Sequence, residues 1–263
     1  MSSVTVPMGW ARDRAGGLLP PLVAGVVILA LWQGLLTLLR PDGFLLPRPS
    51  SIAGALVENR SRILTATQST GFVVVTGLVI GIALGVLAAL LVSRWRTAEE
   101  TITPLAAALN AMPIIAVAPI FNAWFGTLAP RSNQAVVIVV VFFPVFIGTA
   151  RGLSAVDPIH LELMDSLAAS PWRTLRDVRM PHALPFLFTA CKVTSSLAVI
   201  AAIVAEYFGG RQDALGPLIV QSAGLSRYAD AWAGVTAGAA LGIGLYLLVA
   251  AVERLSIPWA LEV

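Results

Sequence analysis

Long stretches without charged residues dominate the hydrophobic pattern of the chain, and short polar segments separate them. A helix needs about 20 mainly apolar residues to cross the hydrocarbon core of a bilayer. Six stretches meet this length, and the fifth is apolar apart from Lys192 and Glu206. The pattern predicts an all-α, polytopic membrane protein with about six transmembrane helices, at 18–39, 63–93, 101–126, 132–151, 183–208 and 231–253.

The first stretch is too long for a secretory signal. Its 22 uncharged residues exceed the apolar region of about 7–15 residues that a signal peptide carries, and it ends in Leu38, Leu39 and Arg40 instead of small residues. We therefore expect an uncleaved first span. The predicted organisation is an N-terminal tail (1–17), a single transmembrane domain (18–255) and a C-terminal tail (256–263).

The orientation follows from the count of spans and the distribution of arginine. An even number of spans places both termini on one side of the membrane. With cytoplasmic termini, nine arginines fall in cytoplasmic segments and seven outside, a small bias of the sign that the positive-inside rule requires. Both termini are therefore predicted to be cytoplasmic.

Glycines recur every fourth residue in two of the predicted spans. One series is Gly77, Gly81 and Gly85, and the other is Gly234, Gly238 and Gly242. Small residues at this spacing allow helix backbones to approach closely in lipid. The alternative is the general enrichment of glycine in membrane helices, and the spacing does not identify the partner helix.

Composition agrees with a membrane location. The chain is 57% hydrophobic and 12% charged, with a mean hydropathy of +0.85, whereas soluble domains carry about 25% charged residues. The net charge of +3 is attributed to residues near lipid headgroups, so no nucleic-acid partner is expected. The single cysteine, Cys191, excludes an intrachain disulfide and a multi-cysteine metal site.

The longest polar interruption is DPIHLELMDSLAASPWRTLRDVRMPHALP, residues 157–185. Helical spacing places apolar side chains on one face of each of two short helices, and Ser170 followed by Pro171 is a strong signal that a second helix begins. We expect Pro181 to end this helix and Pro185 to begin the next span. The predicted structure is a helix–turn–helix on the cytoplasmic surface between spans four and five. Its expected apolar stripes point toward the bundle: Ile159, Leu163, Met164 and Leu167, then Trp172, Leu175 and Val178.

The spacing in this segment resembles the EAA loop of binding-protein-dependent ABC importer permeases of type I. Glu162 matches the glutamate of that motif, Ala168 stands where the motif has glycine, and Val178, Met180 and Pro181 stand for Ile-x-Leu-Pro. If the turn needs a left-handed residue, Ala168 is strained by roughly 1 kcal/mol. A different turn geometry is the alternative.

Other segments extend the resemblance over about residues 20–255. LLPRPSSIAGAL, NAMPIIAVAPIFNAWFG at 110–126 and VAEYFGG at 204–210 resemble the nitrate, sulfonate and taurine branch of these permeases. The last two are most similar to permeases for pyrimidine-type thiamine precursors or riboflavin. The resemblance therefore implies a permease that imports a small organic molecule or anion, in the inner (plasma) membrane of a bacterium.

The resemblance also implies partners. These are a dimer of cytoplasmic ABC ATPases that binds ATP and Mg²⁺, a second permease copy forming a homodimer, an extracytoplasmic solute-binding protein and membrane lipid. No cofactor is expected in this chain. A phosphate-binding P-loop needs glycines before its lysine, and Lys192, the only lysine, follows FLFTAC, so the chain is not expected to be an enzyme. The residues expected to couple to the ATPase are Glu162, Asp165, Ala168, Ala169, Ser170, Pro171, Arg173, Arg176 and Pro181.

Five polar residues are candidates for the solute pathway, each with a structural alternative. Lys192 is either functional or a lysine that snorkels to the interface. Glu206 either faces a gate or solute, or caps a helix end. Asn110 and Asn122 flank a segment that is either a broken helix lining a cavity or a packed helix kinked at proline. Ser195 either offers its hydroxyl to solute or bonds back to its own helix.

Two other classes of protein remain open at this point. A self-contained secondary transporter or channel would need intramembrane ionisable groups for ion coupling, and only Lys192 and Glu206 are candidates for that role. An integral membrane enzyme would need clustered His, Asp or Glu, which the spans do not contain. The permease is the favoured class.

Overall fold

The computed structural model describes residues 10–39 and 46–260. In these ranges every regular element is a helix, which confirms the predicted fold class. The α-helices are α1 (Trp10–Leu39), α2 (Pro49–Glu58), α3 (Arg60–Val92), α4 (Arg96–Asn110), α5 (Ala118–Phe125), α6 (Pro130–Ser154), α7 (Pro158–Ser166), α8 (Pro171–Thr174), α9 (Met180–Phe208), α10 (Leu215–Gly224) and α11 (Tyr228–Ser256).

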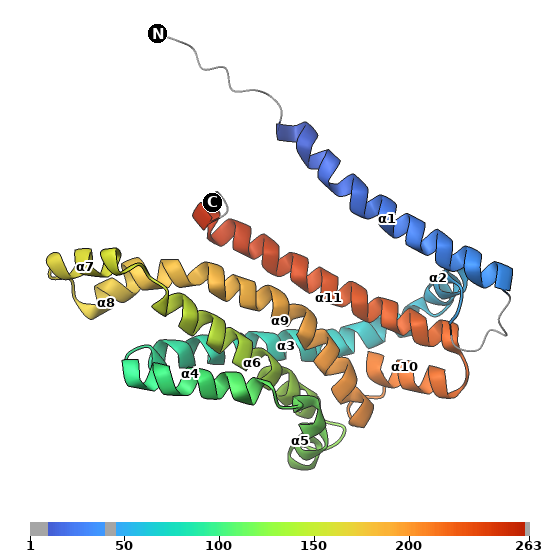
Figure 1. Cartoon of the computed structure of the whole chain (residues 1–263). Helices are drawn as coiled ribbons and strands as arrows, with labels where there is room; N and C mark the ends of the chain where they lie inside the picture. The colour runs from blue at the N-terminus through green and yellow to red at the C-terminus, as the bar shows by residue number, and fades with distance from the viewer. Residues whose placement is uncertain (1–9, 40–45, 261–263) are drawn as a thin grey trace, which may run out of the picture.

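Four helical runs in the described ranges are long and apolar enough to cross a membrane. They are α3, α6, α11 and the run Pro171–Phe208, in which α8 continues into α9. The described apolar part of α1, Val23–Leu38, is shorter. In Figure 1 the long helices lie side by side, with α7 and α8 at one end, here named the loop end, and α2 and α10 at the other, the far end.

The third predicted stretch, 101–126, is not one helix. The helix α4 ends at Asn110, a 3-10 turn covers Ile114–Val117, and α5 begins at Ala118. Pro113 and Pro119 interrupt the segment; proline lacks the N–H that a continuous helix requires, and it crowds the preceding turn. The segment is therefore a broken helix and not one continuous, kinked helix, and its lining a cavity stays a prediction.

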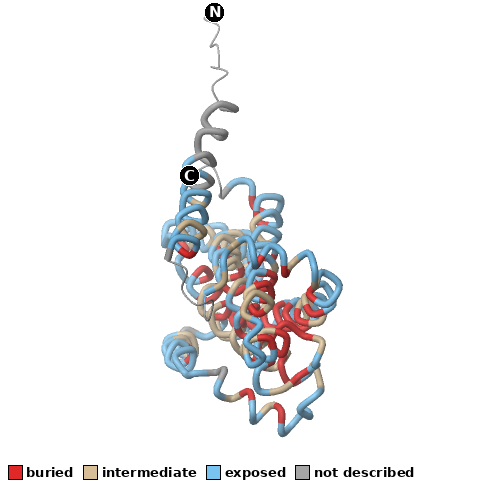
Figure 2. Tube along the Cα trace, turned by 90° about the vertical axis from the view of Figure 1, so that its right-hand side faces the viewer, coloured by how far each residue is buried: buried red, intermediate tan, exposed pale blue. Residues whose placement is uncertain are grey.

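The core lies where α6 packs between α3 and α9. The first glycine series accounts for this contact, because a Cβ on Gly77 would stand 2.6 Å from Val137 and a Cβ on Gly81 2.8 Å from Val141. The expected close approach is confirmed, and the partner is α6. Figure 2 shows the buried residues gathered inside the bundle and exposed residues along its outer surfaces.

The second glycine series contacts two neighbouring helices instead of one. A Cβ on Gly234 would stand 2.7 Å from Leu218 of α10, and one on Gly238 would stand 2.7 Å from Ile203 of α9. Gly242 has only ordinary contact, with Val199 at 3.9 Å. These glycines let α11 lie against both α9 and the short helix α10.

Candidate functional site

The first helix of the loop, α7, has a defined beginning and end. The carboxylate of Asp157 accepts a hydrogen bond from the backbone N–H of Ile159 at 2.9 Å. At the other end the N–H of Ala169 donates to the carbonyl of Met164 at 3.0 Å, and that of Ala168 donates to Asp165 at 2.9 Å. This is the pair of bonds of a Schellman motif. It satisfies carbonyls that the end of a helix would otherwise leave free.

Ala168 occupies the left-handed position of this motif, with φ of +50°. The position favours glycine, since a Cβ there crowds the following carbonyl. The turn therefore has the geometry for which glycine is the usual residue, although this chain carries alanine. The left-handed alternative is correct, and the alternative of a different turn is not needed.

The second helix begins where the sequence predicts. Ser170 accepts a hydrogen bond from the N–H of Arg173 at 3.3 Å, and Pro171 occupies the first helical position. Two further loop arginines lie near one acid: Arg173 is 3.5 Å and Arg176 4.0 Å from the carboxylate of Asp177, and all three are exposed. The charged side chains of Arg173 in α8 and of Arg176 and Asp177 in the turn after it are therefore in contact with solvent.

The predicted helix end at Pro181 is wrong. The chain passes from α8 through a single π-helical segment, Leu175–Arg179, directly into α9, which contains both Pro181 and Pro185. In this wider turn the N–H of Met180 donates to the carbonyl of Leu175, five residues back. A π turn adds one residue to the helix, and it stands where Pro181 would otherwise clash with the preceding turn. The second half of the loop, from Pro171 onward, and the next span are thus one helical run of 38 residues.

The predicted inward direction of the apolar stripes is wrong for four of their seven residues. Ile159, Leu163, Leu167 and Trp172 are between 53% and 70% exposed, so they point away from the bundle. We call these four residues the apolar loop face. Met164, Leu175 and Val178 are partly buried, and Leu175 packs against the buried cluster that contains Phe146 and Leu153. The loop therefore presents apolar and charged side chains together, with Glu162 and Asp165 also exposed.

Glu206, one of the predicted pathway residues, lies in a polar cluster at the far end. It is 3% exposed. Its carboxylate accepts hydrogen bonds from Thr70 of α3 at 3.0 Å and from the backbone N–H of Gly216 in α10 at 2.9 Å. It therefore caps a helix end, as one alternative held, but the helix is α10 and not its own helix, α9. Thr70 was not singled out in the sequence, because nothing in its neighbourhood in the chain indicates this distant contact.

Asn122 is buried at the far end, whereas Asn110 is exposed. The amide of Asn122 donates to the carbonyl of Phe208 at 3.1 Å and accepts a hydrogen bond from Ser132. Asn133, which the sequence did not single out, donates to the carbonyl of Gly209 at 3.0 Å. Together these side chains hold the carbonyls of Phe208 and Gly209, two and three residues after Glu206.

Lys192 is paired and does not snorkel. Its ammonium lies 2.7 Å from a carboxylate oxygen of Glu253 in α11 and 3.0 Å from the other. Neither side chain is exposed, at 23% and 10%. Sequence reasoning missed Glu253, which lies at the edge of the last predicted span and 61 residues from its partner. Ser195 is fully buried and donates to the carbonyl of Lys192 at 2.7 Å, so it bonds back to its own helix.

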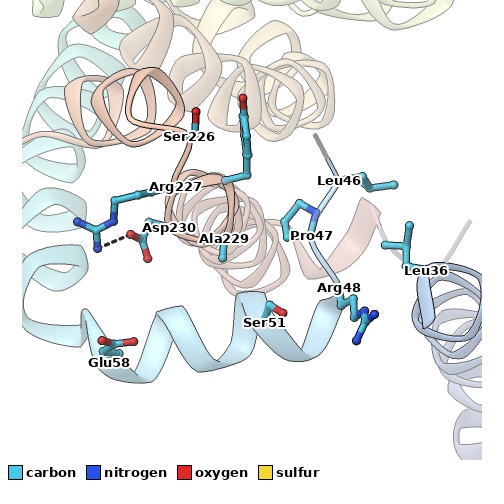
Figure 3. Close-up of a pocket in the computed structure, with 11 residues that line it drawn as sticks. Leu36, Leu46, Pro47, Arg48, Ser51, Glu58, Ser226, Arg227, Ala229 and Asp230 are labelled. Carbon is cyan, nitrogen blue, oxygen red and sulfur yellow. Dashed lines mark ion pairs between the residues drawn. The ribbon is translucent and has the colours of Figure 1, made fainter. Parts of the chain in front are cut away.

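A cavity of about 600 Å³ opens at the far end between α1, α2 and the start of α11. Figure 3 shows α2 running below it, with Arg48 near its start and Glu58 near its end. On the opposite wall, Arg227 pairs with Asp230 at 2.5 Å. None of the five predicted pathway residues lines this cavity. Among the described residues no three His, Cys, Asp or Glu side chains come together as a metal site.

These features define an all-helical protein with several helices of membrane-spanning length and, at one end, an exposed loop that presents apolar and charged side chains together. The chain belongs to the family of binding-protein-dependent transport system inner membrane components, whose model matches residues 81–260. It is therefore the membrane-embedded permease subunit of an ABC importer. This confirms the family assignment made from the loop motif.

The chain is similar to several characterised or named permeases. It is 30% identical over 205 residues to a protein of Haemophilus influenzae described as a probable ABC transporter permease, covering 78% of this chain and 83% of the relative. It is 29% identical to the riboflavin transport system permease of Chloroflexus aurantiacus, with 89% and 87% covered. It is also 29% identical to the formylaminopyrimidine transport permease of Halalkalibacterium halodurans, with 74% and 77% covered.

Solved structures agree on the fold. A crystal structure of an amino acid ABC transporter with histidines superposes with a TM-score of 0.59 at 16% identity, covering 77% of this chain and 96% of that one. The inward-facing methionine ABC transporter gives 0.57 at 20% identity, with 76% and 95% covered. At these identities the likeness concerns the fold alone.

Proposed function

We propose that residues 157–182 dock this permease onto a separate cytoplasmic ATPase, whose ATP and Mg²⁺ drive import. The observation that carries the proposal is the apolar loop face. Its four large side chains are exposed at one end of the bundle. Asp157 caps the start of α7, the Schellman turn ends that helix, and Ser170 caps the start of α8. Large exposed apolar side chains with a polar rim are typical of a protein interaction site.

The surrounding groups support the same partner. Glu162, Asp165, Arg173 and Arg176 are exposed around the apolar loop face, and charges at the rim of an interface contribute specificity. Trp172 also lines a surface cavity of about 700 Å³ with Trp95 and Arg179. A groove beside an aromatic anchor suits the insertion of a partner's side chain.

The docking proposal predicts that Trp172→Ala lowers co-purification of the ATPase by at least about tenfold, since aromatic anchors of interfaces commonly contribute 2 kcal/mol or more. Glu162→Lys is expected to lower association and transport as well, because it reverses an exposed charge of the loop. The measurement is pull-down of the ATPase with the tagged permease from membranes, together with solute uptake.

Trp259→Ala is the matched control. Trp259 is 53% exposed beyond the end of α11, outside the loop, and its removal is expected to leave association unchanged. Equal recovery of the ATPase with Trp172→Ala and with the unmodified chain would reject the docking role. Recovery of ATP-independent transport from the permease alone would instead favour a secondary transporter. The pairing of Lys192 with Glu253 counts against that alternative, since it occupies a charge that ion coupling would need.

We further propose that the loop end is cytoplasmic, which places both chain termini in the cytoplasm, the far end outside, and the protein in a bacterial inner membrane. A second copy of the chain would complete the pathway as a homodimer. The apolar residues Ile120, Trp124 and Phe125 of α5 are exposed and suit such a contact. An extracytoplasmic solute-binding protein would deliver solute at the far end.

For the solute we propose a small organic molecule or anion, with a pyrimidine-type vitamin precursor or riboflavin first. The similarity to the riboflavin and formylaminopyrimidine permeases supports this choice, whereas the sulfonate and taurine permeases are 26% and 27% identical. Calorimetric titration of the solute-binding protein that assembles with this chain would decide among riboflavin, pyrimidines, sulfonates and nitrate. Tight binding of a sulfonate alone would overturn the proposed order.

A further inference from the structure

The carboxylate of Glu206 joins three helices at one point. One oxygen, Oε2, accepts hydrogen bonds from the Oγ1 of Thr70 at 3.0 Å and from the N–H of Gly216 at 2.9 Å. The same Oγ1 of Thr70 accepts a hydrogen bond from the N–H of Leu215 at 2.9 Å. Glu206 of α9 and Thr70 of α3 thus share the first two backbone N–H groups of α10. A carboxylate at a helix N-terminus also interacts favourably with the helix dipole.

The packing around this point leaves no room for α10 to slide on α9. A Cβ on Gly216 would stand 2.5 Å from the Cβ of Glu206 and 2.7 Å from the carbonyl oxygen of Ile203. Leu215 is fully buried and Leu218 nearly so. The first turn of α10 is therefore pressed onto the last turns of α9, and a displacement of one is transmitted to the other.

Glu206 lies on the same helical run as the loop. The run Pro171–Phe208 contains α8, the π turn and α9 without an interruption, and at 1.5 Å per residue it is about 57 Å long. Trp172 of the apolar loop face lies near one end of it and Glu206 near the other. A force applied to α8 is therefore carried along this helix to the N-terminus of α10.

The second oxygen of Glu206 shows that the cluster is not fully satisfied. Oε1 is buried and has no hydrogen-bond partner among the described residues, and the same is true of Oδ1 of Asn133. Both side chains flank Gly210, within 3.7 Å of the point where its Cβ would stand. Burying an acceptor without a partner costs free energy. The two side chains meet beside Gly210, where α9 has ended and the chain continues toward α10.

We propose that Glu206 is a positioning residue for transport: it couples movement of the loop to the position of α10 at the far end. The proposal rests on the docking function proposed above. It assigns α10 the role of the far-end element that follows the state of the ATPase. No part of it requires Glu206 to touch solute.

The test uses the transporter assembled with its ATPase and solute-binding protein in lipid vesicles. Solute imported per ATP hydrolysed is measured, together with the ATP-dependent spectral change of a spin label at Val220→Cys, an exposed position of α10. Glu206→Ala is expected to lower the import ratio about tenfold, as for a coupling free energy in the usual range, and to abolish the change at the label. Glu206→Gln keeps an acceptor for Thr70 and Gly216 and is expected to preserve both readouts.

Asp213→Asn is the matched control. Asp213 is a half-exposed carboxylate beside α10 that pairs with Arg211 at 2.6 Å and accepts a hydrogen bond from Ser69 at 3.4 Å. Asparagine keeps an oxygen that can accept from Ser69, so the substitution is expected to change neither readout. If Glu206→Ala does not assemble with its partners, Thr70→Val is tested in its place. This substitution removes only the hydroxyl between Glu206 and Leu215, and it is expected to reduce both readouts. Unchanged import per ATP and an unchanged label signal in the variant that assembles would overturn the proposal. Failure of the unmodified chain to bind the ATPase would overturn the docking function instead.

Discussion

At the scale of single residues, Ala168 is the position where the chain departs from the favoured geometry. Its φ of +50° carries the crowding of a Cβ in the left-handed region, and glycine removes that crowding. Ala168→Gly is therefore expected to stabilise the protein by about 1 kcal/mol, measured as a higher unfolding temperature in detergent.

Two comparisons make the Ala168 result specific. Ala169→Gly changes the next residue, which lies outside the left-handed region, and is expected to bring no gain. Ser226 has φ of +59° in an equivalent turn after α10, where the N–H of Arg227 donates to the carbonyl of Ser222 at 2.8 Å, so Ser226→Gly is expected to stabilise. A fall in unfolding temperature with Ala168→Gly would contradict the strain.

The Lys192–Glu253 pair makes a second prediction at this scale. Glu253→Ala leaves the Lys192 ammonium largely buried without its carboxylate, and breaking a buried pair destabilises by about 3–5 kcal/mol. The double variant Lys192→Met with Glu253→Leu removes both charges and is expected to be close to neutral. Unfolding by titration with a denaturing detergent compares the two. If the single variant is as stable as the unmodified chain, the pair does not join α9 to α11.

At the scale of elements, the contact between α3 and α6 depends on the small size of the glycines. Gly81→Leu places a side chain where the Cβ alone already stands 2.8 Å from Val141, so overpacking of about 1–3 kcal/mol is expected. Gly244 of α11 has nothing within 4 Å of such a Cβ. Gly244→Ala is expected to be neutral or slightly stabilising, because alanine favours the helix. Thermal unfolding of both variants checks the contrast, and equal effects would contradict it.

The loop helices show what can and what cannot be predicted from helical spacing. The stripe Ile159, Leu163, Leu167 follows from spacing alone, and so does the start of a helix at Pro171. Spacing cannot say whether an apolar stripe faces the protein's own core or a partner, because both satisfy the same hydrophobic requirement. The inward direction expected for the stripe was wrong for that reason. The π turn could not be predicted from the sequence either. It accommodates Pro181 within a helix that continues, and the sequence indicated that the helix ends at this proline.

At the scale of the whole molecule, the all-helical membrane fold and the family could be predicted from the chain. Apolar length determines spans with little regard to tertiary structure, and the loop motif is a local pattern around Glu162. The contacts that join the helices could not be predicted. Thr70 meets Glu206 across 136 residues and Lys192 meets Glu253 across 61. Nothing in the local sequence pairs such residues, because their proximity is a property of the packed bundle.

The ion pair between α9 and α11 also has a consequence for how the chain is made. Lys192 is synthesised 61 residues before Glu253, so α9 enters the membrane with an uncompensated cation that is costly in lipid. The bundle reaches its paired state only after Glu253 of α11 has been translated. A message truncated anywhere between these codons yields a protein that insertion and quality-control machinery can distinguish from a finished one by a single unpaired lysine.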